Sequence, residues 1–127
     1  MKNPEVQDNA VDVQDNAVMV DERRIELGSP VLEAMIGSGV LIVLLDPDSY
    51  LKDPEYRSRR RAGAPAVRNL RAFSMTGDAL WDAELPEDAD YYHRLISADP
   101  IEADSFSSFR CRIDPQNGRI VSKVFLK

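Results

Sequence analysis

The sequence predicts an all-β fold of about eight short antiparallel strands in two four-stranded meanders, folded as a sandwich or an incomplete barrel. Three observations lead to this fold class. Apolar and polar residues alternate on both sides of glycine-containing turns in residues 70–85 and 108–126. Val40–Leu45 is an uninterrupted apolar run, which is typical of a strand covered on both faces. Glycine, proline and aspartate, which favour turns, recur between these segments.

The two meanders are expected to share one design, with a glycine turn before the last strand of each. The strands of the first are expected at Arg23–Ile36, Val40–Leu45, Leu70–Met75 and Leu80–Leu85. Those of the second are expected at Tyr91–Ser97, Ile101–Phe106, Ser108–Ile113 and Arg119–Leu126. A helix between Glu87 and Ser97 is the competing prediction, because acidic residues come early and a basic residue late in that segment.

The hairpins that end the two meanders carry the strongest local signals. Gly77 permits a tight turn, since glycine adopts positive φ without strain. Trp81 follows it on an alternating strand, so its ring is expected on the buried face with a partner for its N–H. In the second hairpin, Asp114–Gly118 has the composition of a turn. The meanders should therefore bury between them Trp81, Phe109, Cys111 and Ile113.

Residues 1–22 form an N-terminal arm that contains a tandem repeat, VQDNAVD from Val6 and VQDNAVM from Val13. In a helix, this seven-residue spacing would align Val6, Ala10, Val13, Ala17 and Val20 on one stripe. Valine, aspartate and asparagine are poor helix formers, however, so a mobile arm is the other interpretation. A single β domain, residues 23–127, is expected to follow the arm.

Residues 46–68 interrupt the β pattern with three prolines and are expected to form a long arginine-rich loop with one helical turn at most. Six basic and four acidic side chains give this segment a net charge of +2. Its candidate contact residues for phosphate, nucleic acid or an acidic protein surface are Arg57, Arg59, Arg60 and Arg61. The arginines are not interleaved with aromatic residues, which argues against nucleic-acid recognition.

Composition narrows the function classes further. A net charge of −6 argues against a general binder of nucleic acid or anionic membranes and favours a basic protein partner. The longest apolar run is far shorter than the roughly 20 residues of a membrane helix, and the N-terminal residues lack the apolar core of a signal peptide. We therefore expect a cytoplasmic protein. Its single cysteine excludes an intrachain disulfide.

Motifs for catalysis, metal binding or cofactor binding are not recognised. His93 is the only histidine, so sites with two or three histidine ligands are excluded, and no Gly-x-Ser-x-Gly motif supports a triad with a nearby serine. Cys111 alternates with polar residues and is expected in the core. The aspartates after Val40–Leu45 lack the glycine and glutamate of a calcium loop. We predict no cofactor, no metal and no catalytic residue.

The densest acidic and aromatic segment is the candidate protein-contact site. It comprises Glu84, Glu87, Asp88, Asp90, Tyr91 and Tyr92. Tyrosines beside carboxylates suit contact with a basic protein. Carboxylates near Asp82–Asp90 would also suit a small hydrolase-like enzyme, and this alternative stays open.

The hairpin LRAFSMTGDALWDAEL resembles the repeat unit of pyrroloquinoline-quinone-type β-propellers. A propeller needs about four blades and this chain has material for two, so neither that fold nor that cofactor is implied. The order VLIVLLDP, NLRAFSMTGDALWDAELP and SFSSFRCRIDPQNGRIVSKVFLK resembles a group of small uncharacterised bacterial β-proteins, some suspected to be immunity (toxin-neutralising) proteins. The resemblance implies a protein-binding module that inhibits a toxin. Exposed edge strands leave homodimerisation by strand pairing open.

Overall fold

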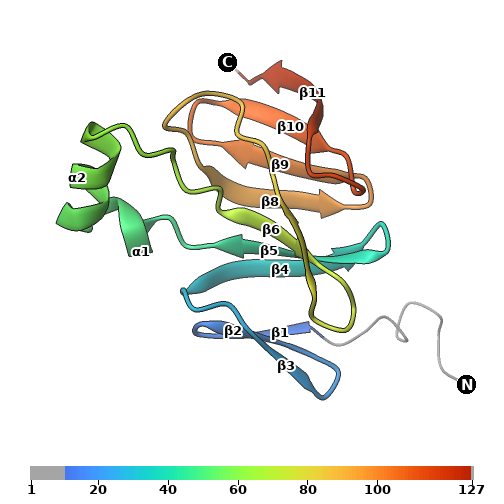
Figure 1. Cartoon of the computed structure of the whole chain (residues 1–127). Helices are drawn as coiled ribbons and strands as arrows, with labels where there is room; N and C mark the ends of the chain where they lie inside the picture. Colours follow the sequence, from blue (N-terminus) through green and yellow to red (C-terminus); the bar gives the residue numbers. More distant parts are fainter. Residues whose placement is uncertain (1–10, 127) are drawn as a thin grey trace, which may run out of the picture.

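The computed structural model describes residues 11–126, which form eleven strands and two short helices. The strands are β1 (Val11–Gln14), β2 (Ala17–Val20), β3 (Arg23–Glu26), β4 (Val31–Gly37), β5 (Val40–Leu45), β6 (Leu70–Phe73), β7 (Ala79–Asp82), β8 (Tyr92–Ala98), β9 (Ile101–Ser105), β10 (Phe109–Ile113) and β11 (Ile120–Phe125). The helices are α1 (Asp48–Leu51) and α2 (Pro54–Arg61). Three antiparallel sheets lie in layers, in the order β1–β3, β4–β7 and β8–β11 (Figure 1).

The predicted all-β class with two four-stranded meanders is confirmed. Strands β4 to β7 and β8 to β11 each pair in chain order. The first predicted strand, Arg23–Ile36, is divided into β3 and β4 by Gly28 and Pro30, because glycine and proline both interrupt strand pairing. The competing helix over residues 87–97 is wrong, since most of that range belongs to β8.

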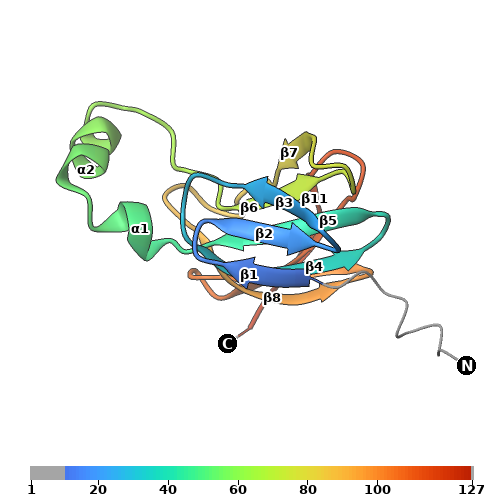
Figure 2. The ribbon, with the colours of Figure 1, turned by 90° about the horizontal axis from the view of Figure 1, so that it is seen from below.

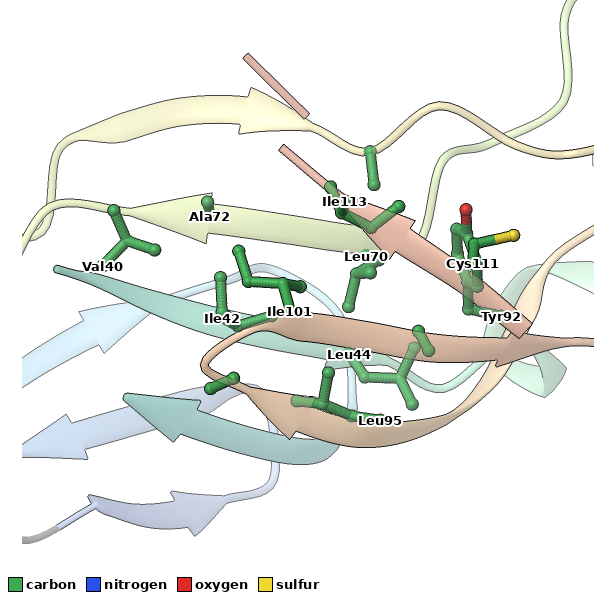
Figure 3. Close-up of a cluster of buried hydrophobic side chains, with 13 residues drawn as sticks. Val40, Ile42, Leu44, Leu70, Ala72, Tyr92, Leu95, Ile101, Cys111 and Ile113 are labelled. Carbon is green, nitrogen blue, oxygen red and sulfur yellow. The ribbon is translucent and has the colours of Figure 1, made fainter. Parts of the chain in front are cut away.

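The main hydrophobic core lies between the two meanders (Figure 3). Alternate residues of β5 and β6 point into it and meet the inward-facing residues of β8, β9 and β10. Its fully buried members include Ile42, Leu70, Tyr92, Ile101 and Cys111. The predicted burial of Cys111 and Ile113 is confirmed, while Trp81 and Phe109 are partly buried and pack against the edge of this core.

β5 is covered on both faces, as its unbroken apolar sequence predicts. The residues of β5 that point away from the main core are Leu41, Val43 and Leu45, and they pack on Val18 and Ile25 of the N-terminal sheet. Figure 2 views the molecule from the side of this sheet. The prediction of a helical or mobile arm is therefore wrong for residues 11–22, which form β1, β2 and the turn to β3. The part of the arm before residue 11 lies outside the described residues.

Asn69 links the two meanders through backbone groups. Its side chain is fully buried and donates to the carbonyl oxygens of Leu45 (3.0 Å) and Tyr92 (2.7 Å). Its Oδ1 accepts from the Tyr92 amide at 2.9 Å. Because Leu45 ends β5 and Tyr92 begins β8, this one amide satisfies backbone groups of both sheets.

Trp81 has the hydrogen-bond partner that its position predicts. The indole Nε1–H donates to the carbonyl oxygen of Pro115 at 2.8 Å, in the turn between β10 and β11. Gly118 lies in the same turn with φ +78°, as expected for its left-handed position. In the other hairpin, Gly77 has φ +98° in the turn between β6 and β7. Both predicted glycine turns are confirmed.

The arginine-rich segment is more regular than the predicted loop. α2 extends over eight residues, and its N-cap, Asp53, accepts a hydrogen bond from the Glu55 amide. Proline at the first helical position and basic residues in the last turn complete the usual pattern of helix ends. In Figure 1, α1 and α2 project from one end of the layered sheets. Neither helix has the length or apolar character needed to cross a lipid bilayer.

Candidate functional site

The predicted acidic segment connects the two meanders. Its first three carboxylates form hydrogen bonds or ion pairs with other residues of the same chain. Glu84 accepts a hydrogen bond from the Ile120 amide at 2.9 Å. Glu87 lies 3.7 Å from the ammonium group of Lys123, and Asp88 lies 3.5 Å from the guanidinium group of Arg60. These carboxylates therefore do not form a continuous, unpaired acidic face.

Two predicted contact residues are buried. Tyr92 is fully buried in the main core, and its hydroxyl donates to the Glu84 carbonyl oxygen at 2.6 Å. Asp90 is 4% exposed, and its Oδ1 accepts from the amides of Tyr91 (2.8 Å) and Ser107 (3.1 Å). The prediction that a partner contacts the Tyr92 side chain is wrong, because its burial completes the core. Asp90 holds the segment before β8 against the turn between β9 and β10.

Tyr91 remains at the surface and forms an aromatic pair. Its ring stacks on Phe106 with centroids 5.0 Å apart and an interplanar angle of 18°. Phe106 is 66% exposed. Partial burial and the nearby carboxylates of Asp48 and Asp90 raise the pKa of Tyr91, so its hydroxyl stays protonated at neutral pH.

The four predicted arginines all belong to α2, but they have different surroundings. Arg59 forms an ion pair with Glu55 one turn earlier, at 2.8 Å. Arg60 is partly buried and donates from Nη1 to the Ala64 carbonyl oxygen at 2.6 Å, which closes the end of the helix. Arg57 donates from Nε to the Leu51 carbonyl oxygen at 2.9 Å. Within residues 11–126, no hydrogen bond or ion pair engages the guanidinium group of Arg61.

A pocket between α2 and the segment before β8 brings the two predicted regions together. We call it the α2 pocket. Its volume is about 290 Å³, and its lining residues are Leu51, Tyr56, Arg57, Arg60, Arg61, Ala89 and Asp90. The Oδ2 atom of Asp90 is buried without a hydrogen-bond partner among the described residues. The pocket therefore combines an apolar floor, three guanidinium groups and one carboxylate.

The arrangement is suited to binding. Within residues 11–126, no three side chains of the types His, Cys, Asp and Glu gather as a metal ion would require. His93 is exposed on β8, whereas Cys111 is buried and burial raises the pKa of its thiol. The carboxylates proposed for hydrolysis have separate partners, since Asp82 pairs with Arg71 at 2.8 Å.

The sequence predicts the arginines of α2 and the acidic segment before β8 as two separate sites, and it does not predict that they line one pocket. Arg60 and Asp88 are 28 residues apart, and no local pattern indicates that distant segments are in contact. The local signals that could have revealed α2 are the N-cap at Asp53 and the spacing of Glu55 and Arg59. Tyr56, the one buried residue of α2, fixes which face of the helix lines the pocket.

Taken together, these features describe an all-β protein of two meanders that carries a helical projection and a charged pocket at one end. The chain belongs to the family described as Domain of unknown function (DUF7957), whose model matches residues 9–125. The matched range includes the N-terminal sheet and the segment that contains α1 and α2. Comparison with curated proteins found no match.

Proposed function

We propose that this protein is a protein-binding module that uses the sheet β8–β11 and its end as a contact surface. The observation that carries the proposal is the distribution of exposed apolar side chains. Seven large hydrophobic residues are exposed among residues 11–126, and five of them belong to β11, its end or the turn between β9 and β10. These five, which we call the apolar strip, are Phe106, Val121, Val124, Phe125 and Leu126. Val124 pairs with Arg110 and Phe125 pairs with Phe109, so the strip covers both faces of the edge strand β11. Concentrated exposed apolar residues mark interaction sites.

Residues of the apolar strip are held in place by backbone hydrogen bonds and by contacts with a neighbouring aromatic ring. The Phe106 amide donates to the Tyr91 carbonyl oxygen (2.9 Å), and the Leu126 amide donates to the Ser108 carbonyl oxygen (2.8 Å). On the adjacent strands, the rings of Phe109 and Phe125 lie 5.4 Å apart. Large aromatic side chains held by neighbouring rings are typical anchors of protein interfaces.

The surroundings of the strip match the anatomy of an interface. Lys123 lies within β11 and pairs with Glu87, so charged groups border the apolar residues. An apolar centre with a polar rim is the usual composition of a protein contact. We extend the proposal to an immunity-type inhibitor that occludes a toxin. The net charge of −6 favours a partner that is basic overall, because opposite charges accelerate association.

Co-expression with a toxin encoded beside the gene tests this function. The native protein is expected to restore growth and to form a complex that calorimetry can measure. Phe106→Asp should weaken the complex by about tenfold or more, because it removes an exposed aromatic anchor. Leu80→Asp is the matched control, since Leu80 is 48% exposed on β7 of the other meander.

Two outcomes would contradict the proposal. Equal affinities for the Phe106→Asp and Leu80→Asp variants would remove the apolar strip as the contact surface. A failure of the native protein to bind or neutralise any product of the neighbouring genes would remove the immunity function. Both substitutions are at exposed positions, so both variants should keep the native fold. The NMR spectra of their backbone amides check this.

A further inference from the structure

The two walls of the α2 pocket differ in their free charge. On the wall before β8, the acidic lining residue is Asp90, whose side chain is buried. Its Oδ1 atom accepts two backbone hydrogen bonds, and its Oδ2 atom is buried without a partner among the described residues. On the opposite wall, Arg57 uses only its Nε atom, and the guanidinium group of Arg61 has no partner among the described residues. The lining thus carries three arginines against one buried carboxylate, so its net charge is positive, and the exposed charged groups are those of Arg57 and Arg61.

The floor of the pocket is apolar and fixed in place. Tyr56 is 7% exposed, and its hydroxyl accepts from the Val67 amide at 3.2 Å. Its ring packs edge-on against Tyr50 with centroids 5.1 Å apart. Leu51 and Ala89 complete the apolar lining. A ligand that fills this pocket thus needs an apolar group as well as a negative charge.

Guanidinium groups at the rim favour a carboxylate over a basic group. Arginine presents planar donors that match the two oxygens of a carboxylate, and charge-assisted hydrogen bonds are stronger than neutral ones. Arg57 and Arg61 lie on one helix, four residues apart, so their side chains project from the same face. Both also line the pocket.

We infer that the α2 pocket binds an acidic segment of a protein partner, with an apolar side chain on Tyr56, Leu51 and Ala89 and a neighbouring carboxylate between Arg57 and Arg61. The inference rests on the proposed protein-binding function and adds the chemistry that one partner segment must have. It concerns a local contact, and the partner can still be basic overall. Tyr91, which stacks on Phe106, directly follows Asp90 of the pocket lining.

Peptide titration of the isotope-labelled full chain tests this inference. The probe is the acetylated and amidated pentapeptide Glu-Glu-Leu-Glu-Glu, and its counterpart is Lys-Lys-Leu-Lys-Lys. The acidic peptide is expected to give saturable shifts of the amides of residues 51–61 and 89–90, whereas the basic peptide should give none. Binding should weaken as salt is raised, because the charges involved are exposed.

The variants on α2 make the test specific. Combining Arg57→Ala with Arg61→Ala should weaken binding of the acidic peptide about fivefold or more, since two charge-assisted contacts are lost. Arg59→Ala is the matched control, because Arg59 is an arginine of the same helix that pairs with Glu55 and does not line the pocket. All three positions are exposed, so the fold should be retained.

The inference would be overturned by equal binding of the two peptides, by no saturable shift, or by an equal loss in the Arg59→Ala variant. Tighter binding of a single-stranded RNA pentamer than of the acidic peptide would also overturn it and assign the arginines to nucleic acid. These results are distinguishable from failure of the proposed function. If the Phe106→Asp variant loses a partner that the arginine variants retain, the protein-binding function stands and the inference about the pocket fails.

Discussion

Gly118 is a residue where the contact between the two meanders depends on the absence of a side chain. A Cβ atom at this position would lie 2.6 Å from Cε3 of Trp81, and the backbone has φ +78°. Gly118→Ala should therefore lower the free energy of unfolding by about 3 kcal/mol, through left-handed strain and overpacking together. Urea denaturation followed by the fluorescence of Trp81 measures the loss.

Gly39→Ala provides the matched control at the residue scale. Gly39 has a similar φ of +81°, but a Cβ atom there would meet no atom within 4 Å. This variant should lose only about 1 kcal/mol, from backbone strain alone. If both variants lose the same stability, the Trp81 ring has space to move and the close packing of the turn on Trp81 does not hold the two meanders together.

At the scale of the element, the N-terminal sheet acts as the cover of β5. Val18 of β2 is fully buried against this face. Val18→Ala should lower the free energy of unfolding by about 2 kcal/mol, because it removes buried methyl groups and leaves a cavity. Chemical denaturation measures this effect, and Glu22→Ala in the exposed turn after β2 should change stability by about 0.5 kcal/mol or less. Equal stability of the Val18→Ala variant and the native protein would indicate that the sheet is not docked.

At the scale of the whole molecule, the core should make stability sensitive to alkaline pH. Burial raises the pKa of the Cys111 thiol and of the Tyr92 and Tyr50 hydroxyls. The native state therefore keeps protons that the unfolded chain releases, first from cysteine above about pH 8.5 and then from tyrosine above about pH 10. The contribution of these three groups to stability should be fully present below the first value and should be lost as pH rises, with a slope of about 1.4 kcal/mol per pH unit for each group.

Urea denaturation at pH 7.5, 9 and 10 measures this dependence. Cys111→Ala should be less stable at pH 7.5, because it truncates a fully buried side chain, yet it should lose less stability between pH 8.5 and 10. The difference in slope isolates the thiol from the tyrosines. Parallel pH profiles for the variant and the native protein would show that the thiolate is tolerated in the core.

Much of the strand architecture was predictable from the sequence, because each signal is local. The alternation around Gly77 and Gly118 defines two hairpins, and the run Val40–Leu45 predicts a strand with two buried faces. The same run implies a covering layer, which the sequence does not identify. The repeat that contains Val13 was compatible with a helical stripe, yet its Asp15 and Asn16 form the turn of a β-hairpin.

The candidate site was predictable only in its parts. The arginines of α2 and the carboxylates before β8 were identified as separate surfaces, and their opposite charges bring Arg60 and Asp88 within 3.5 Å. Neighbouring residues of the predicted contact site also differ in burial. Tyr92 is the first residue of β8 and is buried in the core, whereas its neighbour Tyr91 precedes the strand and lies at the surface, stacked on Phe106.

Local patterns in the chain are sufficient to predict the all-β class, the two meanders and their glycine turns, because hydrophobic alternation and turn chemistry act over a few residues. The packing of the N-terminal strands on β5 and the formation of the α2 pocket between distant segments are seen only in the folded chain. These features depend on which surfaces remain exposed once each sheet has formed. These surfaces are held together by the burial of apolar area, which is non-directional. No residue spacing in the sequence therefore indicates which surfaces pack together.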